Sequence, residues 1–77
     1  MDEKLKEFNH AVIQQASWYR RIKRENPIYL VINAATLAKL TNAYFVSFSQ
    51  NGDINYHTLK VLVDNALPDF AFKVVGE

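Results

Sequence analysis

The residues best suited to bind a ligand form a cluster of cationic and aromatic side chains in the first third of the sequence. It consists of Trp18 and Tyr19, followed by the basic cluster of Arg20, Arg21, Lys23 and Arg24. Lysine and arginine can neutralise phosphates, and neighbouring aromatic rings can stack on nucleic-acid bases. Cations in the last turn of a helix also complement the helix dipole, and the tryptophan would then pack against a sheet. Both interpretations stay open.

Histidine, the commonest metal ligand, occurs only twice in the chain. His10 follows Glu7 by three residues on an expected helix, and His57 follows Asp53 by four residues beyond an expected turn. A metal site needs imidazoles that cluster with carboxylates at a regular spacing. The sequence therefore predicts surface histidines and no metal site.

No pattern for covalent catalysis or for phosphate binding is evident. The chain has no cysteine and two glycines, Gly52 and Gly76. Its serines lie outside the Gly-x-Ser-x-Gly turn that exposes a nucleophile, and a phosphate-binding loop requires more glycines than this chain has. We therefore predict a non-enzymatic protein without cofactors.

Length and composition limit the classes of protein to consider. A chain of 77 residues predicts one domain, residues 1–77. The net charge of +1 indicates neither nucleic acid nor membrane as a partner. No signal peptide and no apolar run of the ~20 residues needed to cross a bilayer are evident. Together with the lack of cysteine, this predicts a cytoplasmic protein with no membrane association.

Aromatic residues make up 13% of the chain, including five phenylalanines and four tyrosines. A domain of this size has a small core, so we expect some of these rings to lie at the surface. Trp18 and Phe48 are our candidates for an exposed patch. Such a patch predicts a protein partner or a homo-oligomer that covers it.

An amphipathic pattern predicts a long helix over residues 3–25, ended by Asn26 and Pro27. Its apolar seam has near-heptad spacing and is interrupted only at Gln15. We expect this seam to pack on the protein's own sheet, although it could also pair with a second helix of the same kind. The seam consists of Leu5, Phe8, Val12, Tyr19 and Ile22.

A strand and a second helix are predicted to follow. Residues 28–32 form an uninterrupted apolar run rich in β-branched residues, which is typical of a central strand covered on both faces. Asn33 is a good N-cap for a helix from Ala34 to about Asn42.

A β-hairpin is predicted for strands 44–50 and 53–58, because Asn51-Gly52 suits the two positive φ values of a type I′ turn. Residues 58–63 and 70–75 are expected to be further strands. Residues 56–67 could instead form a helix, but the β-branched Val61 and Val63 favour the strand.

Residues 27–75 weakly resemble part of a known phage protein family. The segments that carry the resemblance are 29–40, with Val31-Ile32-Asn33 before a Leu-Ala-x-Leu helix, and 60–68, with the apolar strand that ends in a loop at Pro68. They resemble a strand-helix-strand unit of the major capsid proteins of tailed bacteriophages. Here Ala34 stands where that family usually has proline. The resemblance implies a small protein of phage or prophage origin and carries no catalytic residues.

The sequence thus predicts an α+β fold with a long N-terminal helix followed by β-α-β-β-β, in which two helices pack on a sheet of three or four strands. The expected function is that of a small non-enzymatic interaction module that binds a protein partner or itself. The alternative is a nucleic-acid-binding accessory protein that uses the basic end of the first helix. The candidate contact residues are Trp18, Tyr19, Arg20, Arg21, Lys23, Arg24 and Phe48.

Overall fold

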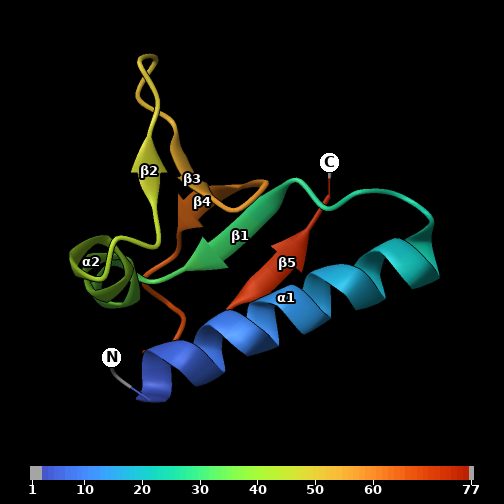
Figure 1. The fold of residues 1–77 in the computed structure, drawn as a ribbon, viewed down its shortest axis with the longest axis horizontal. Coiled ribbons are helices and arrows are strands. Elements are labelled where there is room, and N and C mark those ends of the chain that lie inside the picture. Colours follow the sequence, from blue (N-terminus) through green and yellow to red (C-terminus); the bar gives the residue numbers. More distant parts are fainter. Residues whose placement is uncertain (1–2, 77) are drawn as a thin grey trace.

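The computed structural model describes residues 3–76 and confirms an α+β fold that begins with a long helix (Figure 1). The elements, in chain order, are α1 (Glu3–Lys23), β1 (Tyr29–Ile32), α2 (Ala34–Asn42), β2 (Ser47–Phe48), β3 (Ile54–Tyr56), β4 (Leu59–Val63) and β5 (Lys73–Val75).

The sheet has five strands in the order β2-β3-β4-β1-β5, so the prediction of three or four strands was too low. The fifth strand arises because the chain reverses after Tyr56 through a two-residue turn, His57-Thr58, and pairs β4 antiparallel to β3. His57 has the positive φ of 53° that this turn requires. Residues 59–63 are therefore a strand and not part of a helix. Strand β1 pairs in parallel with β4 and antiparallel with β5.

The predicted hairpin is present, because β2 pairs antiparallel with β3, but its turn differs from the prediction. The amide of Gly52 donates to the Ser49 carbonyl (3.0 Å), and the Ser49 amide donates to the Asp53 carbonyl (2.9 Å). Three residues therefore form the loop, and only Gly52 has a positive φ, of 89°. This is the glycine bulge of a three-residue loop and not a type I′ turn.

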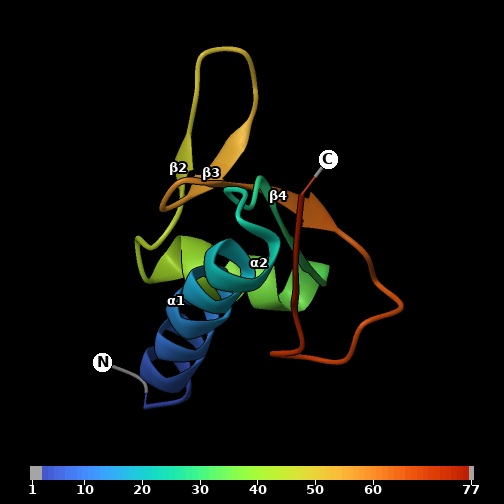
Figure 2. The ribbon, with the colours of Figure 1, turned by 90° about the vertical axis from the view of Figure 1, so that its right-hand side faces the viewer.

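Both helices contribute side chains to one buried cluster on one face of the sheet. Residues that alternate along β1 show this, because Leu30 and Ile32 are fully buried while Tyr29 and Val31 are half-buried. The prediction that β1 is covered on both faces was therefore wrong. β1 is an interior strand, paired with β4 and β5, but within residues 3–76 no helix covers its second face (Figure 2). The buried apolar cluster consists of Leu5, Phe8, Val12, Leu30, Ile32, Leu40, Tyr56, Leu59 and Val61.

Two predicted strands are shorter than expected because each begins after a residue in the left-handed region. Tyr44 has φ 61° and Phe70 has φ 63°. The first lies in the turn that closes α2, where the Phe45 amide donates to the Leu40 carbonyl (3.0 Å). These residues cannot continue a pleated strand, so β2 and β5 begin at Ser47 and Lys73.

The N-terminus of α2 fixes the loop that leads to β5. As predicted, Asn33 is the N-cap, and its Oδ1 accepts from the Thr36 amide (2.8 Å). Its Nδ2 donates to the Leu67 carbonyl (3.1 Å) and to Asp69 Oδ1 (2.7 Å). The Phe70 amide donates to Thr36 Oγ1 (2.9 Å). These bonds determine where the chain enters β5.

Candidate interaction surface

The two halves of α1 have different environments. Its buried side chains are Leu5, Phe8, Val12 and Ala16, all in the first two thirds of the helix. Ile22 is 60% exposed, although the predicted seam included it. A straight helix drifts by ~20° per heptad relative to a seam of 3.5-residue spacing, which is why Ala16 rather than Gln15 is buried. Figure 1 shows that the C-terminal part of α1 extends past β5, the last strand on that side.

Trp18 lies on this projecting part of the helix and is 61% exposed. The alternative in which Trp18 packs against the sheet is therefore wrong. Tyr19 is half-buried and lies against the end of β5, since a Cβ added to Gly76 would overlap the Tyr19 hydroxyl oxygen. The two adjacent aromatic side chains thus differ in role, because Tyr19 packs on its own chain and Trp18 does not.

The basic cluster is exposed at all four positions. Within residues 3–76, the ion pairs are Lys6–Glu3 and Lys60–Asp53, so none involves the cluster. The helix ends at Lys23, and the next residue, Arg24, has φ 55° and donates its amide N–H to the Arg20 carbonyl (2.9 Å).

The basic cluster and Trp18 nevertheless do not form one continuous surface. Arg20 lines a hollow of about 240 Å³ with Ile13 and His57, on the side of α1 that faces the β3–β4 turn. Trp18 lines a different hollow, with Phe72.

Two hollows between α1 and β5 share Gln15 and Phe72 and have volumes of about 450 and 480 Å³. We call them together the α1–β5 groove. Among residues 3–76, none of the residues that line it is acidic, and one, Lys73, is cationic, with its side chain directed to the face of the sheet opposite the core. The lining residues are Ala11, Gln14, Gln15, Trp18, Phe72, Lys73, Val74 and Val75.

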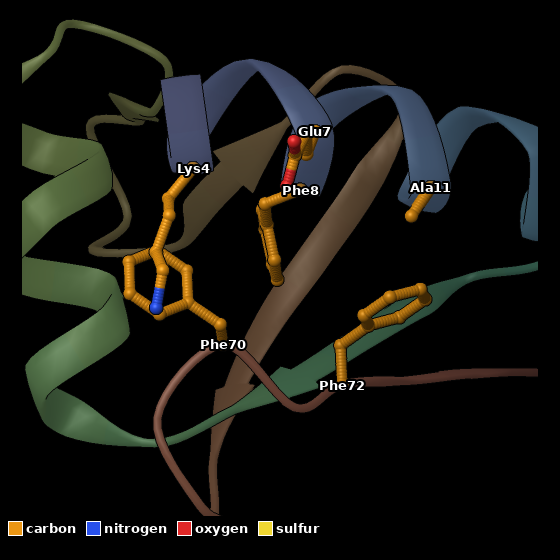
Figure 3. A pocket seen from close by; sticks show the side chains of 6 residues that line it. All are labelled: Lys4, Glu7, Phe8, Ala11, Phe70 and Phe72. Carbon is orange, nitrogen blue, oxygen red and sulfur yellow. The ribbon is translucent and has the colours of Figure 1, made fainter. Parts of the chain in front are cut away.

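A third hollow, of about 260 Å³, adjoins the groove at Ala11 and Phe72 (Figure 3). Its floor consists of packed rings, because Phe8 makes edge contacts with Phe70 and Phe72 at centroid distances of 6.2 and 5.4 Å. The Lys4 ammonium lies 5.6 Å from the centroid of the Phe70 ring. These contacts fix Phe72 at the boundary between the core and the groove.

The outer edge of β5 is open along this groove, since β5 is the last strand of the sheet on that side. Residues of a strand direct their hydrogen-bonding groups alternately to its two neighbours. The carbonyls of Ile28 and Ile32 accept from the amides of Lys60, in β4, and of Asp64, directly after β4 (2.8 Å each). Tyr29 and Val31 therefore face β5.

The partners of Tyr29 and Val31 in β5 are Val75 and Lys73. Val74 lies between them, so its amide N–H and carbonyl point away from β1 to the open edge. The side chain of Val74 lies on the core face, opposite the buried Leu30. An unpaired strand edge of this kind can accept an additional strand.

Phe48 is exposed (61%) but lies on β2, at the opposite edge of the sheet from β5. Figure 1 shows the β2–β3 hairpin projecting away from α1. The structure therefore does not bring Phe48 together with Trp18, and the predicted set of contact residues is divided between two edges.

His57 has a structural contact. Its Nε2 lies 2.9 Å from Asn9 Oδ1, which also accepts a hydrogen bond from the Tyr56 hydroxyl. Burial raises the pKa of Tyr56 to about 12. His10 is exposed. In the part of the chain that the structure describes, no three histidine or carboxylate side chains converge in a way that could hold a metal ion.

Sequence reasoning missed Phe72, Val74 and the open strand edge. The alternation of Phe70, Phe72 and Val74 indicates a strand, but no local signal shows which strand forms the edge. That position depends on the pairing of β1 with two strands that lie about 30 and 45 residues later.

Within residues 3–76, neither helix combines the length and the hydropathy that crossing a membrane requires. Comparison with protein-family models found no match to the chain. Comparisons with curated proteins and with solved structures found no match either. The functional argument therefore depends on the surface itself.

Proposed function

We propose that this protein is a small non-enzymatic interaction module that binds a protein through the α1–β5 groove. The observation that carries the proposal is the 61% exposure of Trp18 beside that groove and beside an open strand edge. Tryptophan is among the residues most enriched at binding hot spots, because it buries a large area on association at a small cost in conformational entropy.

The position of Trp18 on the helix supports this function. The core is already filled by Phe8, Val12 and the strands, so the exposed ring is not needed for the fold. Ile22, one turn further on, is also 60% exposed. Burying both side chains against a partner would remove their apolar surface from water, at roughly 25 cal/mol for each Å².

Size-exclusion chromatography with light scattering, at low and high salt, tests this function. Absorbance at 260 and 280 nm is recorded across the peak. We expect a nucleic-acid-free species that forms a complex with itself or with a co-purifying protein, and that is little affected by salt. Trp18→Glu should abolish the complex and leave the circular dichroism spectrum unchanged. A complex that survives Trp18→Glu would contradict the proposal.

A nucleic-acid-binding accessory function is the second candidate, and the exposed basic cluster favours it. Four cations without ion pairs within residues 3–76 lie near an exposed aromatic ring, which is a combination that binds single strands. This candidate predicts a high 260/280 ratio and an affinity that falls steeply with salt. Charge reversal at Arg21 and Arg24 should abolish such binding, whereas the protein-binding function should tolerate it far better than Trp18→Glu.

A further inference from the structure

We propose that the α1–β5 groove binds an extended, acidic segment of a partner protein, which pairs as a sixth strand with the open edge of β5. This inference rests on the proposed function and specifies the chemistry of the partner. Addition of a strand to a sheet edge is a general mode of peptide recognition, in which main-chain hydrogen bonds give affinity and alternate side chains give specificity.

The edge of β5 offers the required main-chain groups. The Val74 amide and carbonyl point away from β1, as the register with Tyr29 and Val31 shows. A hollow of about 480 Å³ lies directly at this edge and is bounded on the helix side by Gln15. A neighbouring strand lies ~4.8 Å from the strand with which it pairs, so the added segment would occupy this hollow.

The projecting part of α1 would cover one face of the added strand. Figures 1 and 2 show that α1 lies beside β5 and continues past it. Side chains that point toward the helix would meet Trp18, Ala11 and Phe72. Apolar side chains fit these positions, and they would bury the exposed face of Trp18.

Charge indicates what the other face of the segment carries. Lys73 pairs with Val31 and therefore points to the face of the sheet without helices, where alternate residues of the segment would also lie. Within residues 3–76, no acidic residue lines the groove. A segment that alternates apolar and acidic residues complements this arrangement.

A second copy of the chain fits the groove less well. If two copies paired through their β5 edges about a twofold axis, their α1 helices would lie on the same side of the joined sheet. Each α1 already extends across that edge (Figure 1), so the two helices would compete for the same space. An isolated extended segment carries no such helix.

The test uses a capped heptapeptide, Thr-Asp-Val-Glu-Val-Asp-Thr, and a counterpart in which lysine replaces its three acids. Trp18 is the only tryptophan of the chain, so its fluorescence reports directly on the groove. We expect a saturable blue shift with the acidic peptide and none with the lysine peptide. In ¹H–¹⁵N spectra of the protein, the Val74 amide should be among the most shifted signals.

Two sets of variants test separately the open strand edge of β5 and the charge of the groove. Val74→Pro removes an N–H that β1 does not use, so binding should be lost, while the matched control Val74→Thr keeps the N–H and should bind. Lys73→Glu should lower the affinity for the acidic peptide by roughly tenfold or more and raise the affinity for the lysine peptide. Lys6→Glu, on the far side of α1, should change the affinity by less than about twofold.

Equal binding of both peptides, or binding unaffected by Val74→Pro and Lys73→Glu, would overturn the inference. So would a Trp18 shift caused by a twelve-nucleotide oligothymidine and not by the acidic peptide, which would favour the nucleic-acid candidate instead. A protein complex that depends on Trp18 but is indifferent to the peptides and to Val74→Pro would leave the proposed function standing without the added strand.

Discussion

The first and second halves of α1 both carry large apolar side chains, but they differ in how far the rest of the chain covers them. Phe8 and Val12 are 4% and 1% exposed, whereas Trp18 and Ile22 are 61% and 60% exposed. Ile22 continues the predicted apolar seam beyond the last buried residue of the helix, Ala16, whereas Trp18 does not belong to the seam and lies on another face of the helix. An apolar stripe on a helix therefore predicts that this face is buried, but not whether the same chain or a partner buries it.

The largest expected change in stability is that of Phe8→Ala, in the first half of α1. Phe8 contacts the rings of Tyr56, Phe70 and Phe72, so removing it leaves a cavity at the centre of the core. We expect the free energy of unfolding to fall by about 3–5 kcal/mol, measured by urea denaturation. A loss below about 1 kcal/mol would mean that the first half of α1 does not anchor the fold.

The next effect is a pH dependence of stability, and it involves Tyr56, whose ring contacts Phe8 in the first half of α1. Burial raises the pKa of Tyr56 from 10.0 to about 12, so the folded state favours the protonated phenol. The contribution of the protonated phenol to stability is complete below pH 10. As pH rises from 10 to 12 it is lost, and the free energy of unfolding falls by about 2–3 kcal/mol in total. Denaturation between pH 9 and 12 should show this loss, whereas Tyr56→Phe should show a smaller dependence. An equal dependence in both proteins would contradict the assignment.

A smaller change, this time an increase in stability, is expected at the residue that follows α1. Arg24 has φ 55°, a conformation that costs most non-glycine residues about 1–2 kcal/mol. Arg24→Gly should therefore raise the free energy of unfolding by roughly 0.5–1 kcal/mol, part of the gain being offset by a more flexible unfolded chain. Lys23→Gly is the matched control, because Lys23 is helical and glycine there should destabilise by a similar amount.

The smallest effect on stability is expected for Trp18→Ala, which should change the free energy of unfolding by less than about 0.5 kcal/mol. The reason is that the Trp18 ring is mostly in water already. Thermal denaturation compares it with Phe8→Ala. A loss as large as that of Phe8→Ala would remove the contrast between the two halves and, with it, the argument that Trp18 serves a partner.

Sequence patterns correctly predict the features that depend on residues close together in the chain. The start of α1, the capping by Asn33 and the hairpin around Gly52 follow from helix periodicity, capping preference and glycine's conformational range. The ends of elements were less accurate, because left-handed residues at Tyr44 and Phe70 shorten the strands after them. Nothing in the types of these two residues indicates that conformation.

The candidate surface could be predicted only in part. The aromatic and cationic composition indicated Trp18, which the structure leaves exposed. The groove beside it needs Phe72 and Val74, which reach α1 only after β5 has paired with β1. Aromatic composition places Phe48 and Trp18 in one candidate patch, but the strand order puts them at opposite edges of the sheet. Pairing between distant segments is the information that a single sequence does not contain.

The register of β1 has a consequence for how the chain folds. Strand β1, near residue 30, pairs only with β4 and β5, whose residues follow it by about 30 and 45 positions. During synthesis, α1 and β1 therefore emerge from the ribosome before any of their sheet partners exist. Folding that depends on such distant contacts is slow compared with that of helical bundles of similar size. The cover that the fold gives the apolar face of α1 is thus complete only after the last strand has been made.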